Sequence, residues 1–168
     1  MKKWVAGWAE DDIATYPAYA GDEDLIAELQ KRHPGSEIVI ANGAKQALIA
    51  AVDAFRKMRP RTSGLCHHAP YWPSYPTIAA LSDLCFDVGD LDGDIVISTS
   101  PNNPDGSVHE GRADIWDAAY SHAVYGWEPQ MTPEHIVSVW SAAKLFGLSG
   151  LRVGWLVTKD QDLARFAA

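Results

Sequence analysis

Short runs of apolar residues alternate along the chain with turn-rich or amphipathic segments. Seven of these runs are rich in β-branched, aromatic or other apolar residues and are bounded by Gly, Pro, Asn, Asp or Ser, a pattern typical of short buried strands. They cover residues 38–41, 64–67, 84–88, 94–98, 113–117, 136–140 and 153–158. The pattern therefore predicts a seven-stranded sheet.

The segments between the runs predict helices. Residues 44–58 have the periodicity of an amphipathic helix, with Gly43 before its first turn and Pro60 after its last. The face expected to be buried consists of Ala47, Leu48, Ala51, Val52 and Phe55. A second helix is expected over residues 23–32, where a Pro-Gly pair ends it.

Strands that alternate with helices predict a three-layer α/β/α unit with a mostly parallel sheet. The last strand, 153–158, follows a short loop over residues 146–152, which is too brief for a parallel crossover. We therefore expect this one strand to be antiparallel. No repeat or linker divides the chain, so residues 1–168 are expected to form a single domain, with residues 1–22 as an N-terminal arm.

Charge and hydropathy exclude some classes of partner. The chain has 14 Lys and Arg against 22 Asp and Glu, a formal net charge of −8 at pH 7. Its basic residues are scattered among acids, so non-specific nucleic-acid binding, which needs clustered cations, is not expected. No apolar run is long enough to span a bilayer, and acidic residues interrupt the segment after Lys2 and Lys3. We therefore expect a cytoplasmic protein with no membrane segment.

The cysteines and histidines suggest no metal centre. Cys66 and Cys85 are too few for a disulfide framework, and no second pair completes a zinc site. Both are expected to be buried thiols of a reducing compartment.

In parallel α/β sheets, ligands bind beyond the carboxyl ends of the strands. After the first strand, Gly43, Ala44 and Lys45 open a helix, whose free amides form a natural phosphate site. After the second strand, prolines flank a segment in which Trp72 can offer a flat face to a planar ligand. After the fourth strand, Asn103 lies in a turn, where its amide can donate to an oxygen. Each feature alone also fits an ordinary turn or a packing aromatic.

Ionisable side chains follow the fifth and sixth strands. Asp117 ends the fifth strand, where a buried carboxylate would need a cationic partner, and Tyr120 lies three residues later. Lys144 lies among small and apolar residues, where a lysine can act as a nucleophile for imine formation. Arg152 can bind a phosphate through its forked guanidinium. In isolation, each of these also fits a helix cap or a solvated surface group.

Taken in this order, the residues resemble the fold type I family of pyridoxal 5′-phosphate (PLP) enzymes, the aspartate aminotransferase superfamily. The resemblance extends from about Tyr16 to Lys159. The stretches APYWPSY, SPNNPDG and SAAKLFGLSGLRVGW, at residues 69–75, 100–106 and 141–155, are most similar to the group that contains alliinase and the plant tryptophan aminotransferases.

The resemblance implies how the cofactor would be attached. Lys144 is similar to the lysine that holds PLP as an internal aldimine and then acts as the general base at the substrate Cα. Ser141 and Arg152 resemble the residues that bind the PLP phosphate. The turn at residues 43–45 matches the loop that cradles this phosphate.

The resemblance also implies contacts to the cofactor ring. Trp72 would stack on the ring, and Asp117 would pair with the ring nitrogen, which keeps the ring an electron acceptor. Asn103 and Tyr120 would reach the ring hydroxyl oxygen. Tyr16 resembles an N-terminal tyrosine that reaches the phosphate of the neighbouring subunit, which implies a homodimer.

Typical members of this family are longer and carry a second, smaller domain, which supplies an arginine for the substrate carboxylate. Because the last predicted strand ends at Thr158, ten residues before the last residue, the sequence suggests a minimal form without that domain. We expect a PLP-dependent, aminotransferase-like enzyme acting on a small-molecule amine or amino acid. The alternatives are a PLP-dependent decarboxylase or lyase acting on an amino-acid group of a bulky substrate, and a non-catalytic PLP-binding domain.

Overall fold

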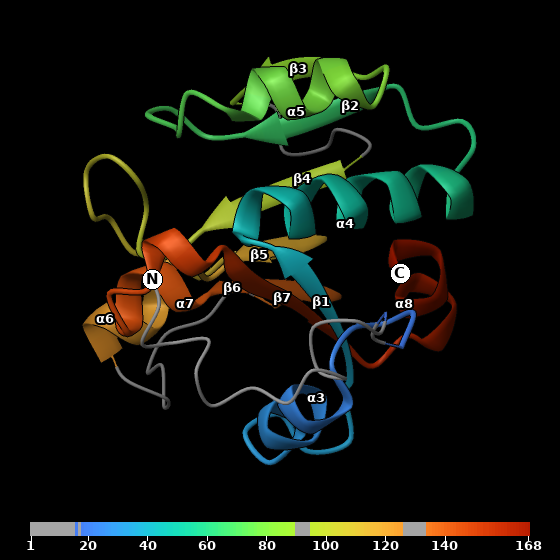
Figure 1. The fold of residues 1–168 in the computed structure, drawn as a ribbon. Helices are drawn as coiled ribbons and strands as arrows, with labels where there is room; N and C mark the ends of the chain where they lie inside the picture. Colours follow the sequence, from blue (N-terminus) through green and yellow to red (C-terminus); the bar gives the residue numbers. More distant parts are fainter. Residues whose placement is uncertain (1–15, 17, 90–94, 126–133) are drawn as a thin grey trace.

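A computed structural model describes residues 16, 18–89, 95–125 and 134–168 (Figure 1). Most of the predicted N-terminal arm and the first residue of the predicted strand 94–98 lie outside the described residues. Within the described part of the chain, no helix combines the length and the apolar character needed to cross a membrane.

Seven strands form one sheet in the order β1-β7-β6-β5-β4-β2-β3. They are β1 (Glu37–Asn42), β2 (Gly64–His67), β3 (Cys85–Val88), β4 (Ile95–Thr99), β5 (Ile115–Asp117), β6 (Val137–Ser141) and β7 (Val153–Thr158). β7 is antiparallel to both of its neighbours, β1 and β6. The remaining pairs, from β6 across to β3, are parallel. The predicted mostly parallel sheet with one antiparallel strand is therefore confirmed.

Helices cover both faces of this sheet (Figure 1). They are α3 (Glu23–Gln30), α4 (Ala44–Met58), α5 (Tyr75–Leu81), α6 (Ser121–Tyr125), α7 (Ala142–Leu145) and α8 (Gln161–Ala167), with a short 3-10 helix, η1 (Ser149–Leu151). α4, α5 and α8 pack in the core on one face, and α3 packs on the other. The connection from β4 to β5 contains no helix. These layers confirm the predicted α/β/α arrangement.

The two main helices follow from their sequences. α4 buries the predicted face, Ala47, Leu48, Ala51, Val52 and Phe55, against the sheet. α3 begins where the Asp22 side chain accepts a hydrogen bond from the Leu25 N–H at 2.8 Å, and it ends two residues earlier than predicted. The strands β1, β5, β6 and β7 alternate their side chains between the two cores, so each of them contributes to both layers.

One prediction about the cysteines is wrong. Cys66 is buried in β2 as expected, but Cys85 is exposed. β3 is the edge strand of the sheet, and its side chains are exposed or half-buried, so burial cannot extend to Cys85.

Candidate active site

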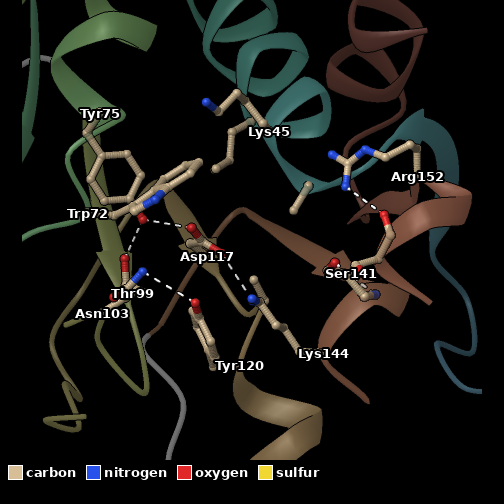
Figure 2. A pocket seen from close by; sticks show the side chains of 15 residues that line it. Lys45, Trp72, Tyr75, Thr99, Asn103, Asp117, Tyr120, Ser141, Lys144 and Arg152 are labelled. Atoms are coloured by element: carbon tan, nitrogen blue, oxygen red, sulfur yellow. Dashed lines mark hydrogen bonds between the residues drawn. The ribbon is translucent and has the colours of Figure 1, made fainter. Parts of the chain in front are cut away.

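A pocket of about 360 Å³ lies at the edge of the sheet where β4, β5 and β6 end and β7 begins (Figure 2). Nine of the eleven predicted site residues line this pocket: Ala44, Lys45, Trp72, Asn103, Asp117, Tyr120, Ser141, Lys144 and Arg152. Gly43 directly precedes Ala44. Tyr16 is fully exposed and does not line the pocket. The fold thus brings together residues from segments that lie far apart in the sequence.

One end of the pocket is suited to an anion. Gly43 precedes the first turn of α4 with φ at 81°, and a Cβ on it would lie 2.5 Å from Arg152 Nη2. Glycine is therefore required for the guanidinium to lie against this turn. The Arg152 side chain is held by a 3.1 Å hydrogen bond from Nη1 to the Ser149 carbonyl. The helix N-terminus and the guanidinium together favour a bound anion.

Ser141 lies beside this end of the pocket, at the junction of β6 and α7. Its Oγ accepts a hydrogen bond from the Ala143 N–H at 3.2 Å, so the side chain caps the short helix and is fixed in direction. This cap also fixes the position of α7, the helix that carries Lys144. One serine thus lines the pocket and orients the lysine-bearing helix.

Asp117 lies at the floor of the pocket and is only 5% exposed. Its carboxyl group is hydrogen-bonded to the Tyr75 hydroxyl at 2.7 Å and accepts a hydrogen bond from the Ala119 N–H at 3.1 Å. Burial raises the pKa of the Asp117 carboxyl, and these two hydrogen bonds oppose that rise. The sequence predicted a cationic partner, but within the described residues Asp117 makes no ion pair, and its two hydrogen-bond partners are neutral. The carboxyl is therefore placed to receive a cation that enters the pocket.

Aromatic side chains form the walls beside Asp117. The Trp72 ring stands edge-on to the Tyr75 ring, with centroids 5.5 Å apart and an interplanar angle of 88°. Lys45 Nζ lies 5.0 Å from the centroid of Trp72. Across the pocket, Asn103 Nδ2 donates to the Tyr120 hydroxyl at 3.4 Å. These walls leave room for a flat ring between polar groups.

Lys144 enters the pocket from α7, and its Nζ lies 5.2 Å from the centroid of the Tyr120 ring. The sequence suggested that small and apolar neighbours surround this lysine; instead its side chain is exposed at the open side of the pocket. Figure 2 shows Lys144 and Asp117 in the same pocket, reaching it from neighbouring elements. The two side chains therefore lie at one site, on the same edge of the sheet.

Three polar residues that sequence analysis did not assign lie behind Asp117. Tyr75, Thr99 and His67 are fully buried and connected by hydrogen bonds. The sequence marked these three residues only weakly as parts of a site. Thr99 and His67 are the last residues of β4 and β2, and Tyr75 ends the APYWPSY stretch. For Thr99 and His67, the position at the carboxyl end of a strand was the one feature that pointed to a site.

Comparisons with known proteins decide the family. A family model, Alliinase_C (Allinase), matches residues 28–167. The chain belongs to the allinase family. It is 31% identical over 150 residues to tryptophan aminotransferase-related protein 2 of Oryza sativa subsp. japonica, which covers 78% of this chain and 30% of that protein. It is 30% identical over 181 residues to capreomycidine synthase of Streptomyces vinaceus, covering 85% of this chain and 46% of that protein.

Solved structures share the fold. The aminotransferase AspB from Helicobacter pylori superposes with a TM-score of 0.72 at 17% identity, over 92% of this chain and 54% of that one. A mutant of Thermus thermophilus aspartate aminotransferase gives 0.72 at 22% identity, over 91% and 51%. The predicted resemblance to fold type I enzymes, and to the alliinase and tryptophan aminotransferase group, is confirmed. This allinase-family chain spans about a third of the length of its first curated relatives.

Proposed function

We propose that this allinase-family chain binds PLP in the pocket and acts as an aminotransferase-like enzyme on the amino group of a small amine or amino acid. One observation carries the proposal: a single pocket contains an accessible amine, a buried acid without a cation, a flat aromatic wall and an anion-binding end. An aldehyde-bearing pyridine with a phosphate has a complement for each of these features.

The residues fit the cofactor at its charged end. The α4 N-terminus, Ser141 and Arg152 would hold the phosphate, and the absence of a Cβ at Gly43 lets the Arg152 guanidinium lie against the helix N-terminus. Lys45, whose Nζ lies beside the Trp72 ring, adds a second cation to the lining of the pocket. Two cations and a helix N-terminus match a group that carries close to two negative charges.

The residues also fit the ring. Trp72 would cover one face of the ring, Asn103 and Tyr120 would approach its hydroxyl oxygen, and Asp117 would hold a positive charge on its nitrogen. When bound, PLP supplies an electron-accepting ring that stabilises negative charge at the Cα of an amino substrate. Asp117 supports this role by keeping the ring nitrogen protonated.

Lys144 would have two roles in succession. Its amine is accessible and would condense with an aldehyde carbon with loss of the aldehyde oxygen as water, which would anchor the cofactor. When a substrate amine has replaced it there, the freed Lys144 amine can take up and return a proton at the substrate Cα. One side chain on α7 would therefore serve attachment and proton transfer.

The choice of amino transfer rests on the curated relatives. Several are named aminotransferases, including the tryptophan aminotransferase-related proteins of Oryza sativa subsp. japonica and a bifunctional aminotransferase of Petunia hybrida. The pocket itself fits the ring chemistry that amino transfer shares with decarboxylation and elimination. A decarboxylase or lyase acting on a bulky substrate is therefore the second candidate, and a non-catalytic PLP-binding unit is the third.

A labelling experiment tests the proposal. The purified chain is mixed with PLP, reduced with borohydride, digested and examined by mass spectrometry. We expect one cofactor-derived mass on the peptide that contains Lys144, and its loss in Lys144→Ala. Lys31→Ala, which removes an exposed lysine of the segment after α3, serves as the control and should retain the label. Absence of label on Lys144 in the folded wild-type chain would contradict the proposal.

A second measurement separates the three candidates. The PLP-loaded chain is incubated with a panel of amino acids, and the products are identified. A 2-oxo acid that keeps the substrate's side chain, formed without free ammonia, indicates amino transfer, and carbon dioxide indicates decarboxylation. A 2-oxo acid that has lost its side-chain leaving group, formed together with ammonia, indicates elimination. Labelled Lys144 without any product would indicate a PLP-binding unit that does not catalyse these reactions.

We also propose a homodimer. Tyr16 is 100% exposed and lies outside the pocket of its own chain, as a residue that contacts a neighbouring subunit would. Tyr19, 87% exposed, adds a second aromatic to the same segment. Sedimentation equilibrium of the wild-type chain and of Tyr16→Ser is expected to show a dimer that the substitution weakens. A wild-type chain that stays monomeric at every concentration would refute the dimer but would not affect the labelling of Lys144.

A further inference from the structure

Asp117 is one end of a buried chain of hydrogen bonds that runs from β5 to the end of β2. Figure 2 shows its first part, from Asp117 through Tyr75 to Thr99. The Tyr75 hydroxyl lies 2.7 Å from Asp117 Oδ2 and 2.5 Å from Thr99 Oγ1. Thr99 Oγ1 lies 3.0 Å from His67 Nε2, and His67 Nδ1 lies 2.6 Å from the carbonyl oxygen of His68. Every side chain in this chain of contacts is at most 5% exposed, so water does not complete it.

The direction of each hydrogen bond follows from the groups involved. The His68 carbonyl can only accept, so His67 Nδ1 must carry a proton and donate it. In a neutral imidazole, Nε2 is then an acceptor, so the Thr99 hydroxyl donates to it. The single proton of Thr99 is thereby used, and the Tyr75 hydroxyl must donate to Thr99. No proton of Tyr75 is left for Asp117.

A count of protons gives the same result. Four contacts need four protons, but a neutral His67, Thr99, Tyr75 and an ionised Asp117 supply three. The fourth proton must be on His67, as imidazolium, or on Asp117, as carboxylic acid. Because these side chains are at most 5% exposed, although Tyr75, Thr99 and Asp117 line the pocket, this choice determines the charge at the pocket floor.

The surroundings favour Asp117 over His67. Burial lowers the pKa of His67 to about 4, and the neighbouring His68 and His109 add to that decrease. Burial instead raises the pKa of Asp117, which favours its protonated form. The ring of His67 is stacked on the ring of Tyr75, with centroids 4.9 Å apart, which leaves the imidazole no polar partner on that face.

We propose that in the cofactor-free protein Asp117 is protonated and donates its proton to Tyr75, so that all four hydrogen bonds point from the pocket floor toward the His68 carbonyl. Tyr75, Thr99 and His67 are then positioning residues that act through Asp117. When a cation occupies the pocket beside Asp117, the acid releases this proton to water in the pocket, and Tyr75 turns its hydroxyl from Thr99 to the carboxylate. The network thereby keeps the pocket floor neutral until a positively charged group arrives.

Other ionisable groups surround this network and enter the same balance. They are His68 and His109 behind His67, and Tyr120, Lys45, Lys144 and Arg152 across the pocket. The three cations favour an ionised Asp117, but they are exposed, so water screens their effect. The inference concerns the site of the proposed function, so its test is made on the chain without cofactor.

The test follows the Asp117 carboxyl carbon by NMR in aspartate-labelled, cofactor-free protein, with Asp117→Asn to assign the signal. We expect Asp117 to remain protonated at neutral pH. Thr99→Val removes the hydroxyl in the middle of the network and frees Tyr75 to donate to Asp117. The proton affinity of Asp117 should then fall about five- to tenfold, the effect of one hydrogen bond.

Two control variants and one further measurement make the result specific. Thr99→Ser keeps a hydroxyl and should restore the wild-type titration, and Thr77→Val, on the exposed side of α5, should not change it. If Thr99→Val does not fold, the nitrogen signals of His67 in the wild-type chain decide: we expect a neutral ring with its proton on Nδ1. An ionised Asp117 at neutral pH, a doubly protonated His67, or an unchanged titration in folded Thr99→Val would each overturn the inference. Labelling of Lys144 tests cofactor binding separately.

Discussion

At the scale of single residues, burial has opposite effects on acids and bases in this protein. Asp117 on β5 and His67 on β2 lie in the same network, and burial moves the pKa of the first up and that of the second down. Both shifts favour the uncharged side chain. A site built from neutral buried groups holds a charge only when a ligand brings the opposite one, which suits a pocket that is to bind a charged ring.

A second buried base lies away from the pocket and gives a pH prediction. His122 is 3% exposed and stacks on Trp140, with centroids 4.2 Å apart, and burial lowers its pKa from 6.5 to about 4. Between these values the unfolded chain binds a proton at this position and the folded chain does not. The contribution of His122 to stability is therefore full above pH 6.5 and is lost as the pH falls toward 4.

We expect His122→Phe, which keeps the stacked ring, to flatten this pH dependence. Urea unfolding at a series of pH values should show that the free energy of unfolding falls less steeply with decreasing pH in the variant than in the wild type. The two slopes should differ by at most about 1.4 kcal/mol per pH unit. His67 changes the stability with pH in the same direction as His122, and Asp117 changes it in the opposite direction. Because both residues are present in the wild type and in the variant, the difference between the two curves isolates His122. Parallel curves for the wild type and the variant would contradict the prediction.

Residues that would contact a ligand directly could be predicted from the sequence. Residues that act by hydrogen-bonding to another side chain of the site could not. Lys144, Asp117 and Arg152 stand in motifs whose order is specific, and the structure places all three in one pocket. The Tyr75 hydroxyl, which lies 2.7 Å from Asp117 Oδ2, was not predicted, because packing of α5 in the core beside β4 brings it there. Such hydrogen bonds depend on side-chain directions that no spacing along the sequence encodes.

At the scale of elements, the most restrictive contact is between the start of β7 and the N-terminus of α4. A Cβ on Gly154 would lie 2.4 Å from the Gly43 carbonyl carbon and 2.5 Å from the Ala44 nitrogen, both backbone atoms. Neither neighbour can move without shifting the anion-binding turn. The strands and α4 were predicted from periodicity, but this contact was not, since it depends on the order β1-β7-β6, which periodicity does not give.

Gly154→Ala should therefore impair both stability and anion binding. We expect a loss of about 1–3 kcal/mol in the free energy of unfolding from overpacking, and weaker binding of PLP because the turn that carries Ala44 is displaced. Urea unfolding and a PLP titration measure the two effects. Gly150→Ala is the matched control, because a Cβ on Gly150 meets no atom within 4 Å. Equal stability of the two variants would show that the contact is looser than the structure indicates.

At the scale of the whole molecule, the candidate site lies over the central strands of the sheet, and the exposed strand residues lie at its edge. The pocket lies over β4, β5 and β6, whose residues are buried throughout, whereas β3 at the edge has no buried residue. The chain carries a net charge of −8, yet three of its cations line the pocket. The α/β class and the antiparallel last strand followed from the sequence, but the position of β3 at the edge did not.

The two cysteines differ in exposure, so the reactivity of their thiols tests this arrangement of strands. Cys66 on β2 is 1% exposed, between β3 and β4, while Cys85 on β3 is exposed. A thiol reagent reaches a buried cysteine only when the strands around it separate. We therefore expect one thiol per folded chain to react rapidly with Ellman's reagent, and the reaction to be absent in Cys85→Ser. The second thiol should react at the rate at which the chain opens, and its rate should rise with urea. Rapid reaction of both thiols in the native protein would mean that β3 detaches from β2 without unfolding of the rest. The edge of the sheet would then be a separate, less stable unit.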